Sequence, residues 1–115
     1  MITDSTRSKV ATDLVTLIAA GSAKIGLGGN STSPAATDLD VPVAGDIASL
    51  SVIKSDENVI EIKVSVDGAS IAGLVIREVG VFDTNDNLLT RNNFTAIGPF
   101  SSTETLELFI IWEIE

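Results

Sequence analysis

Residues 59–66 read Val-Ile-Glu-Ile-Lys-Val-Ser-Val, and this stretch decides the fold class. Apolar side chains recur at every second position, with charged or polar side chains between them. Successive side chains on a β-strand point to opposite faces, so the pattern predicts a strand with one buried and one exposed face. The side chains predicted to point inward are Ile60, Ile62, Val64 and Val66.

On both sides of this strand, further β-forming stretches are separated by turn residues such as Asp67-Gly68 and Gly98-Pro99. Short turns between neighbouring strands favour antiparallel pairing. The additional strands are expected at residues 23–27, 48–54, 71–82, 88–94 and 104–114.

Residues 4–20 follow a different pattern, because their apolar side chains recur at a helical spacing. Asp4 or Ser5 is the expected N-cap, and Gly21 is the expected stop. The apolar stripe of this helix is formed by Val10, Leu14, Leu17 and Ile18.

The predicted fold is therefore α+β and mainly β, with an N-terminal helix followed by an antiparallel β-sandwich of about six strands. The chain has 115 residues, which suits a single domain. Within residues 1–115, we expect the helix at 4–20, the sandwich at 21–115 and a flexible loop around 28–44.

The composition excludes many functional classes. The chain has no cysteine and no histidine, which removes thiolate zinc sites, cysteine nucleophiles and the Ser-His-Asp triad. A net charge of −9 repels nucleic-acid phosphates. No apolar run approaches the roughly 20 residues that span a bilayer. We therefore expect no enzymatic activity, cofactor, metal, nucleic acid or membrane insertion.

Two features could still form a binding site. The turn at residues 83–87 offers carboxylate and amide oxygens for a calcium ion, although such turns are common without an ion. Whether this turn binds an ion stays open at this stage. Trp112 could stack on a sugar, but its Ile-rich strand favours packing in the core or in an interface.

Two predicted strands are apolar on both faces, which implies cover on both sides. In residues 74–82, we assign the face of Leu74, Ile76, Glu78, Gly80 and Phe82 to the core. A neighbouring subunit is then the expected cover for the opposite faces. The predicted oligomer interface consists of Val79, Val81, Phe109 and Ile111.

Glu78 lies among apolar residues on its predicted strand face and would be costly to bury without a partner. Arg91 follows the hairpin turn at about the distance that brings it opposite Glu78 in an antiparallel pair. We therefore predict a structural ion pair between Glu78 and Arg91, with a hydrogen bond from the backbone of a turn to Glu78 as the alternative.

Residues 77–83 read Arg-Glu-Val-Gly-Val-Phe-Asp, and residues 87–94 read Asn-Leu-Leu-Thr-Arg-Asn-Asn-Phe. This segment resembles the core of tail-fibre and tail-collar-like structural proteins of tailed prokaryotic viruses. In those sequences a Glu-(Ile/Val)-Gly-(Ile/Val/Leu)-Phe-Asp strand precedes a turn, a Leu-Leu-x-Arg stretch and a final alternating strand. Residues 25–39 are similar to their Gly- and Thr-containing loop. The resemblance extends from about Thr6 to Glu113.

The resemblance implies a non-enzymatic virion protein at the distal tail, baseplate or fibre base. Its implied partners are other virion proteins and copies of itself, as a homotrimer or another symmetric oligomer. It would be synthesised in the host cytoplasm and reside in the virion tail. Two alternatives stay open, namely a capsid decoration or head-fibre protein and a glycan-binding receptor module.

Overall fold

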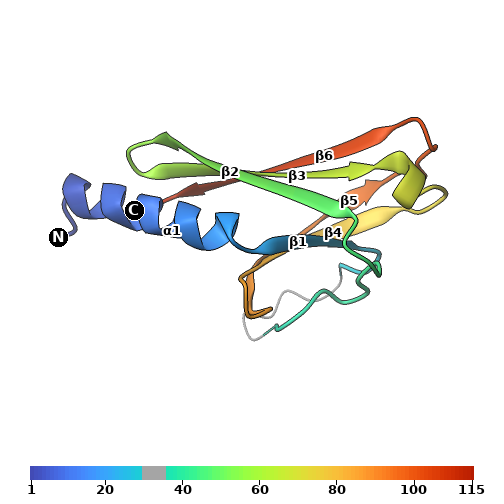
Figure 1. The fold of residues 1–115 in the computed structure, drawn as a ribbon, viewed down its shortest axis with the longest axis horizontal. Coiled ribbons are helices and arrows are strands. Elements are labelled where there is room, and N and C mark those ends of the chain that lie inside the picture. Colours follow the sequence, from blue (N-terminus) through green and yellow to red (C-terminus); the bar gives the residue numbers. More distant parts are fainter. Residues whose placement is uncertain (30–35) are drawn as a thin grey trace.

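The computed structural model describes residues 1–29 and 36–115 and contains one helix followed by six strands, as predicted (Figure 1). Part of the flexible loop expected around residues 28–44 lies outside the described residues. The elements are α1 (Asp4–Ala19), β1 (Ser22–Gly26), β2 (Ala48–Asp56), β3 (Val59–Asp67), a 3₁₀ turn (Gly68–Ser70), β4 (Ile76–Phe82), β5 (Leu88–Ile97) and β6 (Thr105–Glu113).

The strands form two antiparallel three-stranded sheets that pack face to face. Sheet A has the order β1-β4-β5, and sheet B has the order β2-β3-β6. Figure 1 shows α1 leading directly into β1 beneath sheet B. The layer opposite sheet B therefore consists of the helix at one end and sheet A at the other. The predicted α+β, mainly β sandwich is confirmed.

The main core lies between sheet B and this second layer. The inward set predicted on residues 59–66 is buried, with Ile60, Ile62 and Val64 fully inaccessible. On both sides of β3 the neighbouring strands run antiparallel, so inward residues of all three strands share one face. Ile25 of β1 and Ile18 of α1 complete the opposite side. The inward residues predicted from the alternation therefore belong to one continuous core.

The helix differs in detail from its sequence prediction. Its N-cap is Thr3, whose Oγ1 accepts a hydrogen bond from the backbone N–H of Thr6 at 3.2 Å, and not Asp4 or Ser5. Of the predicted stripe only Ile18 is buried, whereas Val10 and Leu17 are 38% and 41% exposed. The helix meets only the end of sheet B, so its contact surface is narrower than the stripe.

The strand expected at residues 71–82 begins only at Ile76. The 3₁₀ turn and Gly73, which has a φ of +78°, reverse the chain before it can extend. In the described part of the chain, no helix combines the length and apolar character needed to cross a membrane.

Candidate assembly surface

The four residues predicted to form an interface are divided between the core and the surface. Val79 and Val81 are 2% and 0% exposed within the single chain, so their assignment to a subunit interface needs correction. Both faces of β4 are apolar, and alternation alone does not tell which face meets the other sheet. The packing turns Val79 and Val81 toward sheet B. On the opposite face, assigned above to the core, Ile76 does belong to the core cluster, whereas Glu78 and Gly80 lie against a loop.

Phe109 and Ile111 lie on the outer face of sheet B and are 61% and 64% exposed. The register of sheet B places Ile53, Glu61 and Ile111 in one row across the three strands. Ile53 on β2 is also exposed, at 58%. The outer face of sheet B thus carries large apolar side chains on both edge strands, with the charged row of β3 between them.

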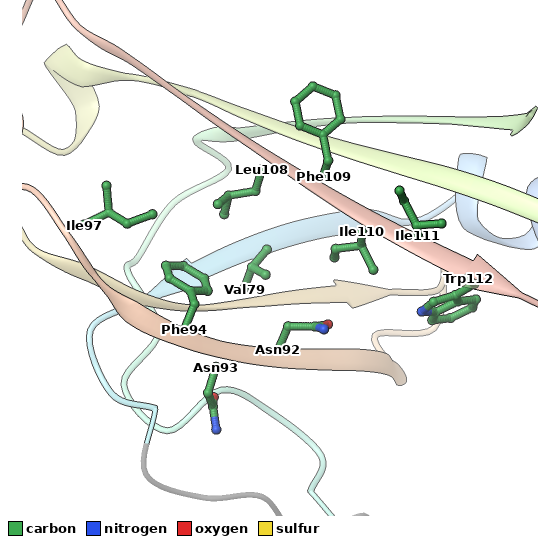
Figure 2. A pocket seen from close by; sticks show the side chains of 10 residues that line it. All are labelled: Val79, Asn92, Asn93, Phe94, Ile97, Leu108, Phe109, Ile110, Ile111 and Trp112. Carbon is green, nitrogen blue, oxygen red and sulfur yellow. The ribbon is translucent and has the colours of Figure 1, made fainter.

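The sandwich is open along the side where β5 and β6 lie. Each of these strands is the last in its sheet. A groove of about 400 Å³ separates them (Figure 2). Asn92, Leu108 and Ile110 point into this groove, whereas Phe109 points away from it. The groove is lined by Val79, Asn92, Asn93, Phe94, Ile97, Leu108, Phe109, Ile110, Ile111 and Trp112.

The other edge of sheet A is closed by a segment that we call the cover (residues 38–43). Val43 donates a backbone hydrogen bond to Ile25, and Leu27 donates one to Val41, both at 2.9 Å. The cover also crosses the outer face of sheet A, where Leu39 is only 5% exposed. Sheet A is therefore covered on its outer face and along its β1 edge.

Glu78 holds the cover in place from the middle of sheet A. It is completely buried, and its carboxylate accepts backbone hydrogen bonds from Asp40 at 2.6 Å and from Val41 at 3.3 Å. Charge-assisted bonds of this kind are stronger than neutral ones and satisfy a carboxylate that water cannot reach. Glu78 therefore acts as an internal anchor for the cover.

The predicted direct pair between Glu78 and Arg91 also needs correction. Arg91 lies opposite Gly80, and Glu78 lies opposite Asn93, a displacement of two residues from the expected register. A bulge between Val81 and Phe82 accounts for part of it, because it adds a residue after the turn. A two-residue shift keeps Arg91 on the face of Glu78.

Arg91 and Glu78 are linked through the cover. The Arg91 guanidinium forms an ion pair with the Asp40 carboxylate at 3.4 Å and donates to the carbonyl of Asp38 at 3.3 Å. Asp40 therefore joins the two: its N–H binds Glu78, and its carboxylate binds Arg91. The charge of Arg91 is therefore paired with Asp40, a residue that was not among the predicted site residues.

Glycines make the close approach of the cover possible. A Cβ added at Gly28 would lie 2.4 Å from Glu78 Oε2 and 2.5 Å from Asp40 Cβ. A Cβ at Gly80 would lie 2.8 Å from a methyl carbon of Leu39. At Gly28 the nearby Cβ of Asp40 leaves no room for a side chain, whereas at Gly80 a side chain would have to displace the end of the Leu39 side chain. The signal that could have revealed the cover was the lone acidic residue Glu78 in an apolar strand with Gly80 two positions after it.

The turn at residues 83–87 uses its oxygens locally. The Asp83 carboxylate accepts hydrogen bonds from the backbone N–H groups of Asn85 and Asn87, both at 2.9 Å, and from the Asn87 side chain at 3.1 Å. Backbone and side-chain hydrogen bonds from Asn87 lower the pKa of Asp83. Within residues 1–29 and 36–115, no group of three or more metal-ligating side chains is placed to hold an ion.

No protein-family model matches this sequence, and no curated protein matches it significantly. The resemblance to viral tail proteins therefore rests on the short motifs quoted above.

Proposed function

We propose that this chain is a non-enzymatic structural protein of a tailed virus, located at the distal tail, baseplate or fibre base. It works by assembling with copies of itself and with other virion proteins. The motif resemblance at residues 77–94 supports the viral location. The exposed apolar side chains of sheet B support the assembly role.

The observation that carries the assembly role is the exposure of Phe109 and Ile111 on an edge strand beside an open groove. Burying one such side chain fully contributes about 1.5–3 kcal/mol. At their exposures of 61% and 64%, covering both contributes about 2–4 kcal/mol. Covering these two side chains therefore offsets part of the translational and rotational entropy that association costs, and the remaining contacts of the interface must supply the rest.

The location is tested in purified particles of the virus whose genome encodes the chain. Peptide mass spectrometry should find the chain in intact particles, and gold-labelled antibodies should mark the end of the tail away from the capsid. Absence from washed particles would overturn the proposal. Label distributed over the capsid would instead establish the alternative of a decoration or head-fibre protein.

A second candidate function, a glycan-binding receptor module, is favoured by the position of Trp112. This side chain lines the open groove together with Asn92, whose amide points inward (Figure 2). An aromatic ring beside an amide suits a sugar, which offers a flat C–H face and hydroxyl groups. A glycan array with the wild-type chain and Trp112→Ala tests it. If the wild-type chain binds a glycan and Trp112→Ala does not, the receptor role is supported. If the wild-type chain binds no glycan on the array, the receptor role is excluded.

A further inference from the structure

Strand β6 has an unusual edge. Residues 108–112 read Leu-Phe-Ile-Ile-Trp, an uninterrupted apolar run between Glu107 and Glu113. On one side β6 pairs with β3, and in the described part of the chain no strand pairs with its other side. Proteins usually protect such edges with lysine, proline or a bulge. This run has none of these devices.

A strand edge is best covered by another strand, because its outward N–H and C=O groups need partners. The charge of −9 restricts which partner fits, since two copies of an acidic chain repel each other over most of their surface. Residues 108–112 of β6 and residues 92–97 of β5 carry no charged side chain. This side of the sandwich is therefore a place where two copies can approach closely.

The apolar run is also self-complementary. If two β6 strands pair antiparallel about Ile110, each Phe109 lies across from Ile111 of the second copy. Leu108 then lies across from Trp112 of the second copy on the inner face. If one strand slipped by two residues, the apolar run of each strand would no longer lie fully across from that of the other. Depending on the direction, Glu113 or Glu107 would then lie opposite an apolar residue. The symmetric register therefore gives the largest apolar contact.

We propose that two copies of this chain pair through β6, antiparallel and about a two-fold axis at Ile110. The two B sheets then join into one continuous six-stranded sheet. The exposed Phe109 and Ile111 become central in its outer face, and the two grooves meet beneath it. This proposal deepens the assembly role proposed above and rests on it.

The symmetric register places Glu107 across from Glu113 of the second copy, and like charges at such positions are destabilising. Lys63 lies 3.4 Å from Glu107 and offsets part of this repulsion. The remaining repulsion, and that of the overall charge, is screened by salt. The dimer should therefore tighten as the salt concentration rises, unlike a dimer held by opposite charges.

Sedimentation equilibrium of the 115-residue chain tests the interface at low and high sodium chloride. The expected species is a dimer that is tighter in high salt. Ile111→Lys should weaken the dimer by at least about tenfold. The matched control is Ile53→Lys, in the same row of the same face but on the other edge strand, and it should leave the dimer unchanged. Equal loss in both variants would indicate stacking of outer faces and overturn edge pairing.

Cross-linking tests the register. Directly opposed residues of antiparallel strands have Cα atoms about 4.5–5.5 Å apart, within the range of a disulfide. The chain has no cysteine of its own, so Ile110→Cys should form a disulfide-linked dimer on mild oxidation. The control Val52→Cys lies in the same row of sheet B on the opposite edge and should stay monomeric after oxidation. A trimer, or equal cross-linking of both variants, would overturn the proposed pairing.

The two proposals fail separately. A chain that stays monomeric in high salt overturns the β6 pairing, while mass spectrometry of virions still decides the viral role. A chain that pairs through β6 but is absent from virions retains the interface and loses the viral role.

Discussion

The outer faces of the two sheets differ in how they are completed. The outer face of sheet A is closed by the cover, which is anchored by the buried carboxylate of Glu78 and by the ion pair between Arg91 and Asp40. The outer face of sheet B is open, and Phe109 and Ile111 project from it. The same chain therefore supplies its own second layer for one sheet only.

This difference shows how polar groups and apolar groups serve separate purposes in the molecule. The cover is held by polar groups that need defined partners within the chain, so its removal would leave buried groups unsatisfied. The exposed apolar residues of sheet B leave no polar group of the single chain unsatisfied when water covers them. Substitutions on the outer face of sheet A should therefore affect stability, whereas those on sheet B should affect assembly.

Glu78→Ala tests the covered face most severely. It removes the acceptor of the Asp40 and Val41 backbone N–H groups and should lower the free energy of unfolding by about 3–5 kcal/mol. Urea denaturation measures the loss. Glu61→Ala, on the outer face of sheet B, is the matched control and should change stability by less than about 0.5 kcal/mol. Similar losses in both variants would contradict the distinction between the two faces.

Leu39→Ala tests the apolar part of the cover. Leu39 is 5% exposed, so its truncation should cost about 2–4 kcal/mol in thermal or urea unfolding. Val41→Ala is a control within the same segment. Because Val41 is 49% exposed, its truncation should lower the free energy of unfolding much less. If the Leu39 variant is as stable as the control, the cover does not contribute to the packing of sheet A.

The pH dependence of stability tests the turn that joins the two strands β4 and β5 of sheet A. The pKa of Asp83 is lowered in the folded state by hydrogen bonds from Asn87, so its ionised form stabilises the fold. This contribution is complete above the unfolded pKa of about 3.9 and is lost as the pH falls through the lower folded value. Asp83→Asn should therefore be less stable than wild type at pH 6 and approach it at pH 2. If the difference in unfolding free energy between wild type and Asp83→Asn were the same at pH 2 and pH 6, this role of the Asp83 carboxylate would be contradicted.

Phe109→Thr should have the smallest effect on the folded chain. Phe109 is 61% exposed, and threonine suits a strand, so the unfolding free energy of the monomer should change by no more than about 0.5 kcal/mol. The same variant should dissociate the oligomer in sedimentation experiments. A large loss of monomer stability would mean that this face contributes to the fold itself.

Much of the fold could be predicted because alternation is a local property. The pattern of residues 59–66 identified the inward set of β3, and turn residues separated most of the strands. The choice of core face on β4 could not be made in this way, because Val79 and Val81 alternate with residues that are also buried. Only the packing of sheet A on sheet B distinguishes these two faces.

The site was harder to predict because its partners are distant in the chain. Glu78 binds backbone groups of Asp40 and Val41, which lie in an irregular segment without periodic pattern. The register of Arg91 depends on a bulge, which counting from the turn does not include. The same argument from two apolar faces identified the exposed residues Phe109 and Ile111 on β6 but failed on β4, because the cover closes the second face of β4.

The anchoring of the cover has a consequence for how the molecule opens and closes. Asp40 and Val41 bind a residue 38 and 37 positions away, whereas β2–β3 and β4–β5 are joined by short turns. Closing the longer loop has the larger entropic cost, so the cover should dock after the hairpins have formed. The main core lies on the other face of sheet A, so the cover can detach while the sandwich stays intact. In amide hydrogen exchange, Asp40 and Val41 should then exchange as one cooperative unit ahead of the β3 amides.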